Sequence, residues 1–486
     1  MPKNAARAEQ AGWLWRAAAI VLALTALRVA LLAVTPLDLF VDEAQYWLWG
    51  QELAFGYYSK PPMIGWVIRA VTELAGSDAP FWVRLPGPLF HAATALILAG
   101  IAAGLFGARA AVLVAAGYAP LPMVALASIL ISTDTVMFPF LALALAGYVR
   151  LLNKRGTARA ALLTGLALGL AFLSKYAAIY YLICAALAAA ILPGARPRPR
   201  DALIVLAAFA VTIAPNIGWN ILNGFSTVEH TLDNADWVRA PASRAGLNVS
   251  GFLSFFASQF AVFGPVLFGG LLWMAMRARG VGPERQLLLI FSLPILAIVC
   301  VQALLSGAYA NWAAAAYLAG TVTVLPWLSR PWLILSFAIN GALSLALPLA
   351  GALALHPALD GNPALARYLG RAAMSTQIIT AARQAGLSTV VAQNRDILAD
   401  LFYTGRDSGL RFYAPPATGR APHHYALKYP VPADAAGPGL FVSDIPAGPG
   451  CAPDAAPLGT IAPDSGAYRG KVKYLFAVPA TCWATP

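Results

Sequence analysis

The chain has 486 residues, of which 59% are hydrophobic and 11% are charged, and its formal net charge is +12. A soluble globular domain carries roughly 25% charged residues, so this composition excludes an ordinary soluble enzyme and indicates a membrane protein. Nucleic-acid binding is not expected, because the basic residues form no stripe interleaved with aromatic residues.

The first apolar run extends from Trp13 to Val34, after Lys3 and Arg7. It exceeds the core of a signal peptide in length, so we interpret it as a retained signal-anchor helix, with cleavage as the alternative. Later apolar runs are blocks of Leu, Ala, Ile and Val without period-two alternation, which predicts membrane helices and not a barrel.

About eleven spans of membrane length are predicted. They begin near Trp13, Leu85, Ala108, Thr135, Ala158, Tyr176, Ala202, Gly251, Gln286, Trp312 and Trp332. Loops on one predicted side are rich in arginine, whereas the opposite loops hold more acids than bases. The positive-inside rule therefore predicts a cytoplasmic N-terminus and places the loop after the first span outside.

That first outer loop, "FVDEAQYWLWGQELAFGYYSKPPMIGW", contains the first chemical candidates. Asp42 and Glu43 are adjacent in a predicted helix, where neighbouring side chains point about 100° apart. We expect one to contact substrate and the other to hold a backbone or basic partner. The alternative is that Asp42 only caps the helix.

Lys60 precedes two prolines, which favour extended backbone at the lysine. The sequence thus presents a cation beside Tyr57 and Tyr58 at the membrane interface, where a lipid phosphate would need one. The alternative is a lysine that only extends toward the headgroups.

Two further charges lie at the ends of spans. Asp134 in "LISTDTVMF" is predicted at the outer rim, with helix capping by Ser132, Thr133 or Asp134 as the rival role. Lys175 in "AFLSKYAAIYY" lies between two apolar runs, so it should have an anionic partner from the protein or a lipid.

The other outer candidates are Arg84, and His230 and Arg239 in a long loop of the kind that often forms a lid or binding wall. The short loop "GAYANWAAAAY", with Asn311, leaves a binding or a structural role open. The sequence contains no HxxxH or CxxC pattern, and no cofactor is expected. A divalent cation on Asp42 and Asp134 is the alternative.

The tail changes character near His356 and predicts a small soluble α/β domain over residues 356–486, after a membrane domain over residues 1–355. "STQIITAARQAGLSTVVAQN" predicts a helix, a glycine stop and a strand, "DILADLFYTG" another helix, and "GLFVSDI" and "KVKYLFAVP" strands. In an oxidising compartment Cys451 and Cys482 would form a disulfide; two free thiols are the alternative.

The ordered set "VDEAQYWLWG", "YYSKPPMIGW", "VRLPGPLFHA", "STDTVMFPFLALA", "GLALGLAFLSKYAA" and "WNILNGFSTVEH" resembles bacterial family 39-like glycosyltransferases of the GT-C fold. Relatives include the aminoarabinose transferase, rhizobial galacturonosyltransferases and protein O-mannosyltransferases. The resemblance covers roughly residues 10–330. It implies a mainly helical membrane bundle that takes a sugar from a polyprenyl-phosphate donor and inverts the anomeric centre.

The resemblance also implies roles for individual residues. Asp42 matches the general base or acceptor anchor, and Glu43 matches its neighbour. Lys60 matches the lysine near the donor phosphate. Asp134 and Lys175 match the acid that opens the fourth span and the basic residue after the fifth. Asp42, Glu43 and Asp134 are therefore the candidate catalytic residues, and Lys60 and Lys175 are candidate cations for the donor phosphate. The remaining candidates for donor or substrate binding are Tyr58, Arg84, His230 and Arg239.

The sequence thus predicts a glycosyltransferase of the bacterial inner membrane that acts at the periplasmic face on lipid A, its core, another glycan or a protein. The residue before Lys60 is Ser59, whereas the corresponding motif of the aminoarabinose transferase reads "EKP". This difference argues against aminosugar transfer. One alternative is a transporter or flippase for a lipid-linked sugar, which would place its charged groups near the bilayer midplane. Another is an inactive relative that scaffolds envelope assembly.

Overall fold

A computed structural model describes residues 2–152, 156–234, 246–417, 419–435 and 437–482. The chain divides into two compact units. The first comprises residues 1–33, 54–71 and 84–349, and the second comprises residues 34–53, 72–83 and 350–486. The second unit therefore combines the tail with two segments from the region between the first two predicted spans.

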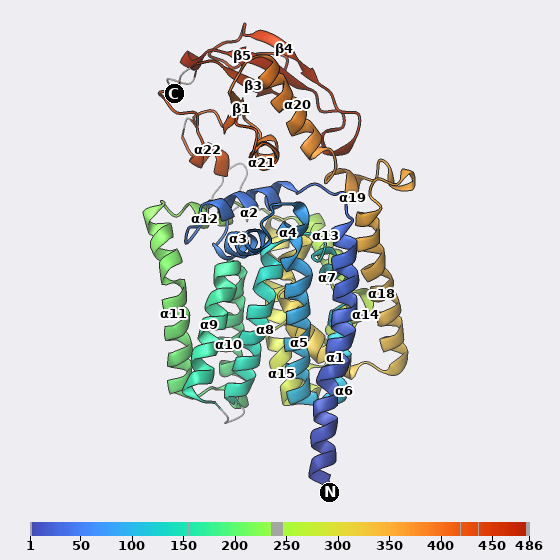
Figure 1. The fold of residues 1–486 in the computed structure, drawn as a ribbon. Coiled ribbons are helices and arrows are strands. Elements are labelled where there is room, and N and C mark those ends of the chain that lie inside the picture. The colour runs from blue at the N-terminus through green and yellow to red at the C-terminus, as the bar shows by residue number, and fades with distance from the viewer. Residues whose placement is uncertain (1, 153–155, 235–245, 418, 436, 483–486) are drawn as a thin grey trace. The chain divides into compact units, whose positions relative to one another are not determined.

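The first unit is a bundle of helices (Figure 1). Its helices are α1 Pro2–Ala33, α3 Met63–Ala75, α5 Pro86–Phe106, α6 Ala108–Tyr118, α7 Pro122–Leu126, α8 Thr133–Leu152, α9 Ala158–Ser174, α10 Ile179–Ile191, α11 Pro199–Leu222, α12 Ser226–Asn234, α13 Val249–Val262, α14 Pro265–Met276, α15 Pro283–Ile290, α16 Leu293–Leu305, α17 Ala316–Val324 and α18 Arg330–Ala352, with short 3-10 turns η1 Tyr176–Ala178, η5 Ala310–Ala313 and η6 Leu325–Trp327. Helices α3 and α18 end in the second unit. Figure 1 shows α3, α7 and α12 at one end of the bundle and the N-terminal end of α1 at the other.

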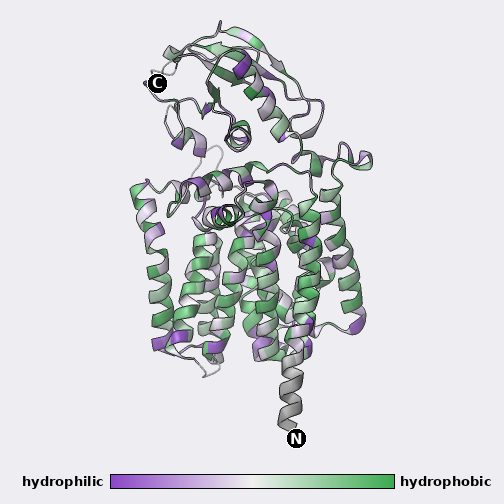
Figure 2. Ribbon diagram, viewed as in Figure 1, coloured by the Kyte–Doolittle hydropathy of each residue, from purple (hydrophilic) through white to green (hydrophobic). Residues whose placement is uncertain are grey.

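The surface of this bundle is apolar. On α11, Leu203, Val211 and Leu222 are 68%, 74% and 86% exposed, and Figure 2 shows hydrophobic residues along the length of the bundle helices. Among the described residues, six helices are long and apolar enough to cross a membrane, or seven if α13 and α14 form one broken span. Long helices with an apolar outer surface are typical of contact with lipid, so the chain is a multi-pass membrane protein.

Every predicted span has a helical counterpart near its expected start, but several are short or broken. The helices at Ala108–Tyr118, Ala158–Ser174 and Tyr176–Ile191 fall in the range of 10–17 residues. The span expected from Gly251 bends by 115° between α13 and α14. At this bend Gly264 takes φ +89°, a left-handed conformation that glycine adopts easily. Pro265 follows as the first residue of α14, where its missing N–H is tolerated, so the two residues together end one helix and begin the next.

The second unit is built on a five-stranded sheet in the order β2-β1-β3-β5-β4. The strands are β1 Thr389–Ala392, β2 Arg411–Tyr413, β3 Gly439–Ser443, β4 Ala456–Ile461 and β5 Lys473–Val478, and the helices are α2 Val41–Gln51, α4 Pro80–Arg84, α19 Pro363–Ala366, α20 Arg371–Gln384, α21 Arg395–Thr404 and α22 His424–Lys428. Strand β1 pairs in parallel with β2 and β3, whereas β5 is antiparallel to β3 and β4. The sheet core contains Val391, Phe441 and Phe476.

The α/β character of the tail is confirmed. The predicted helices correspond to α20 and α21, and the predicted strands correspond to β1, β3 and β5. Gly386, between α20 and β1, takes φ +67°, as a glycine stop requires. Strands β2 and β4 and helix α22 are absent from the prediction. Cys451 and Cys482, the pair expected to meet, form a disulfide with their Cα atoms 5.2 Å apart.

Replacing Cys451 and Cys482 by serine should destabilise the sheet unit. The disulfide closes a loop with a sequence separation of 31, and loop-closure entropy for that length corresponds to about 3.5 kcal/mol. Limited proteolysis of the purified double variant in detergent should therefore cut residues 356–486 earlier than in the wild type. A matched Cys184→Ser variant changes a buried thiol outside the disulfide and should leave this cleavage rate unchanged. Equal cleavage of the tail in all three proteins would contradict the prediction.

Candidate active site

An ion pair lies at the ends of two helices in the first unit. Lys175 Nζ lies 2.7 Å from Asp134 Oδ1 and 2.8 Å from Oδ2. Asn311 Nδ2 donates to Asp134 Oδ2 at 2.7 Å. The lysine and aspartate side chains are 18% and 10% exposed. Asp134 is thus the anionic partner that a lysine between two apolar runs requires.

Local structure explains why these two side chains can meet. Helix α9 ends at Ser174, and Lys175 has extended backbone angles before η1 begins. Helix α8 begins at Thr133, so Asp134 lies in its first turn, where the helix dipole favours a carboxylate. Ser132 Oγ accepts from the Thr135 backbone N–H at 3.3 Å, which caps the helix. The Asp134 carboxylate is therefore available for Lys175.

The loop that carries Lys60 is fixed to α11 and α12. Asn216 Nδ2 donates to the Phe55 carbonyl at 2.6 Å, and Thr227 Oγ1 donates to the Tyr57 carbonyl at 2.5 Å. The backbone N–H of Tyr57 donates to the Lys60 carbonyl at 3.1 Å, closing a tight turn. Lys60 is half-buried on this turn, and its backbone is held in place before the chain enters α3.

Other candidates of the first unit fall into three groups. The rings of Tyr58 and His230 form an edge-to-face pair with centroids 5.2 Å apart, so the structure brings these two residues together. Arg84 is completely buried at the end of α4. Arg239 lies outside the described residues.

The adjacent acids of α2 belong to the second unit and have different contacts. Glu43 is 2% exposed, and its Oε2 accepts from the Phe40 backbone N–H at 2.9 Å. Asp42 is half-exposed, and its Oδ1 accepts from Arg395 Nη2 at 2.5 Å. Glu43 therefore caps the helix, and Asp42 does not.

Arg395 was not a candidate in the sequence analysis. It is the first residue of α21, and its Nε also donates to Gln45 Oε1 at 2.9 Å. Asp42 and Arg395 lie 353 residues apart in the chain. A contact over such a distance has no signal in local spacing, so only the structure identifies it.

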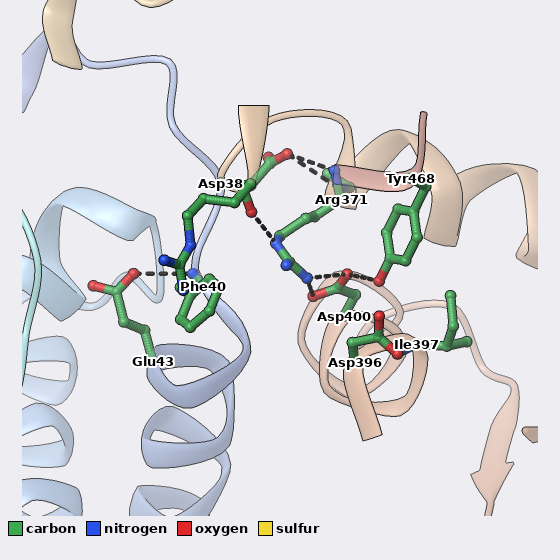
Figure 3. A network of polar contacts seen from close by, with 10 residues as sticks. Asp38, Phe40, Glu43, Arg371, Asp396, Ile397, Asp400 and Tyr468 are labelled. Carbon is green, nitrogen blue, oxygen red and sulfur yellow. Dashed lines mark hydrogen bonds and ion pairs between the residues drawn. The ribbon is translucent and has the colours of Figure 1, made fainter. Parts of the chain in front are cut away.

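A second polar network joins the segment after α1 to the tail, within the second unit (Figure 3). Asp38 Oδ2 accepts from the backbone N–H groups of Arg371 and Ala372 at 2.9 and 3.3 Å, at the beginning of α20. Arg371 Nη1 donates to Asp400 Oδ2 at 3.0 Å, and the Tyr468 hydroxyl donates to the same oxygen at 2.6 Å. Burial raises the pKa of Asp400 to about 7, although Arg371 and Tyr468 act in the opposite direction.

These groups can perform acid–base and anion chemistry. Asp42 is a half-exposed carboxylate that could accept a proton, and Lys60 is a positioned cation that could bind a phosphate. Within the part of the chain that the structure describes, no group of three or more His, Cys, Asp or Glu residues could hold a metal ion. The structure thus offers a candidate base and candidate anion-binding cations.

Comparison with known proteins identifies relatives along nearly the whole chain. Residues 59–219 match the family model described as dolichyl-phosphate-mannose-protein mannosyltransferase. The chain is 43% identical over 473 residues to the lipid A galacturonosyltransferase RgtD of Rhizobium johnstonii, covering 96% of this chain and 98% of RgtD.

Two solved structures share the fold. They are ArnT from Cupriavidus metallidurans in the apo state and bound to undecaprenyl phosphate, with TM-scores of 0.62 and 0.64. Each is 17% identical to this chain, and each match covers 98% of this chain and 99% of ArnT. The expected GT-C fold, a helical membrane bundle with a small α/β domain, is therefore confirmed.

Replacing Asp134 by asparagine should leave the Lys175 ammonium without its counter-ion in a partly buried position. Removal of one partner of a buried pair costs about 3 kcal/mol or more, so the thermal unfolding midpoint in detergent should fall by several degrees. The double change Asp134→Asn with Lys175→Gln should recover much of the loss, because no unpaired charge remains. A double variant less stable than Asp134→Asn alone would contradict this account of the pair.

Proposed function

The chain belongs to the family 39-like GT-C glycosyltransferases that include RgtD, and we propose that it transfers a sugar from a polyprenyl-phosphate donor to lipid A. The observation that carries this proposal is the 43% identity to RgtD over 96% of the chain. On the same basis, the proposed sugar is a galacturonosyl group. The proposed location is the periplasmic face of the bacterial inner membrane, because basic residues collect in the loops of the opposite predicted side.

Undecaprenyl phosphate bound to ArnT, which shares the fold, supports a polyprenyl-phosphate donor. Lys60 is the proposed principal cation for the donor phosphate, because the turn at Tyr57 fixes it at the start of α3. The charge of Lys175 is already balanced by Asp134. We assign this pair, with Asn311, to a fixed polar wall of the site.

The proposed reaction inverts the anomeric carbon in one displacement. Asp42 accepts the proton of the acceptor hydroxyl while that oxygen bonds to the anomeric carbon. The bond from this carbon to the phosphate oxygen breaks, and its electron pair remains on the departing polyprenyl phosphate. The leaving group is a stabilised anion, so it needs nearby cations and no proton donor.

The transporter alternative fits the structure less well. A transporter usually holds its substrate near the bilayer midplane in interrupted helices. Asp134 and Lys175 instead lie at helix ends, and the half-exposed Asp42 belongs to the unit that carries the sheet. Charged groups at helix ends fit an enzyme that acts at a membrane surface better than a transporter.

The variant Asp42→Asn should lower sugar transfer by about 100-fold to 10,000-fold, because the amide cannot accept the proton. The measurement is mass spectrometry of lipid A from a deletion strain that expresses each variant at matched membrane levels. Asp407→Asn is a suitable control, since that aspartate is 89% exposed in the same unit. Full modification by Asp42→Asn would remove this residue from the mechanism.

The variant Lys60→Ala should raise KM for the polyprenyl-phosphate donor by about tenfold or more, equivalent to about 1.4 kcal/mol of lost binding. Lys60→Arg keeps the charge and should retain most of the donor affinity. Initial rates with purified enzyme and varied donor concentration check both changes. Lys428→Ala, which removes an exposed lysine, serves as the control. Unchanged donor kinetics in Lys60→Ala would exclude a phosphate-binding role for Lys60.

A further inference from the structure

The guanidinium of Arg395 bridges two side chains on one face of α2. Its Nη2 donates to Asp42 Oδ1 at 2.5 Å, and its Nε donates to Gln45 Oε1 at 2.9 Å. Residues three apart in a helix are neighbours on its surface. Gln45 is 1% exposed, so its amide gives the planar guanidinium a fixed second attachment.

Helix α2 is also held by contacts that do not involve Arg395. Trp47 Nε1 donates to Asp78 Oδ1 at 2.8 Å, and the Tyr403 hydroxyl donates to the Asp78 carbonyl at 2.5 Å. The rings of Trp47 and Tyr403 pack edge to face with centroids 5.0 Å apart. Removal of Arg395 should therefore leave α2 in place within the second unit.

Stability does not account for the ion pair between Asp42 and Arg395. The two side chains are 46% and 39% exposed, and solvent-exposed pairs contribute little to folding. The pair instead fixes the rotation of the carboxylate, since Oδ1 accepts from Arg395. Among the described residues, no hydrogen bond to Oδ2 of Asp42 occurs, so this oxygen is available to another donor.

We infer that Arg395 is a positioning residue for the proposed reaction: it holds Oδ1 of Asp42 and leaves Oδ2 for the acceptor hydroxyl. This inference rests on the proposed function. The guanidinium remains protonated throughout, so Arg395 exchanges no proton with the acceptor. The proton moves to Oδ2 and then to water after the sugar has been transferred. The second unit thereby supplies both the proposed base and the residue that orients it.

The first test compares kinetics of Arg395→Ala, Arg395→Lys and the control Arg411→Ala, which removes an exposed arginine of β2. Misplacing a reacting group by about 1 Å can cost 100-fold in rate, so kcat of Arg395→Ala should fall by about 10-fold to 100-fold. KM for the donor should stay within about twofold. The unfolding midpoint should fall no further than in Gln45→Ala, which breaks the same hydrogen bond. Arg395→Lys can reach Asp42 but cannot reproduce the fork to Gln45, so its kcat should be intermediate.

The second test is a double-mutant cycle with Asp42→Asn. If Arg395 acts through Asp42, adding Arg395→Ala to Asp42→Asn should lower the residual rate by less than about twofold. Independent, multiplicative losses would overturn the inference. So would an unchanged kcat in Arg395→Ala, or an equal loss of kcat in Gln45→Ala. If Asp42→Asn is inactive while Arg395→Ala is normal, only the inference fails; a wild-type enzyme without lipid A transfer would overturn the proposed function as well.

Discussion

Charge compensation is the constraint on which the first unit depends. In a bundle covered by apolar side chains, a largely buried ammonium group at the end of a helix is stabilised by an anion within contact distance. Lys175 is stabilised in this way by both oxygens of Asp134, which also accepts from Asn311. Three helical elements distant in the sequence are therefore joined at one polar point. The loop that bears Lys60 is fixed separately, by side chains of α11 and α12 that bond to its backbone.

The two adjacent acids of α2 have different roles because neighbouring side chains of a helix point in different directions. Glu43 turns toward the N–H of Phe40 and is buried, whereas Asp42 points to Arg395 and remains half-exposed. The Glu43 carboxylate is held at the start of the helix by its bond to the backbone. Asp42 does not cap the helix, so it is the better candidate for proton transfer.

Sequence reasoning succeeded where the signal is local. Apolar runs predicted the helix positions, and apolar segments predicted β1, β3 and β5, since most of their residues are buried. It failed for β4, where five of the six residues are exposed and no alternation appears, and for β2, which has three residues. The candidate residues are paired over long stretches of sequence: 41 and 177 residues in the first unit, and 353 residues in the second. A lysine in an apolar run predicts that a partner exists but cannot identify it, and Arg395 in a polar tail carries no such signal.

The composition of the second unit has a consequence for biosynthesis. Residues 34–53 leave the ribosome early, yet their partners in α20 and α21 follow more than 300 residues later. At about 5–20 residues per second, the delay is roughly 20–70 s. During this interval Trp47 and Trp49 have no sheet unit to pack against. These two aromatic residues therefore lack their partners Tyr403 and His424 until translation is nearly complete, and a chain truncated before α20 would lack them permanently.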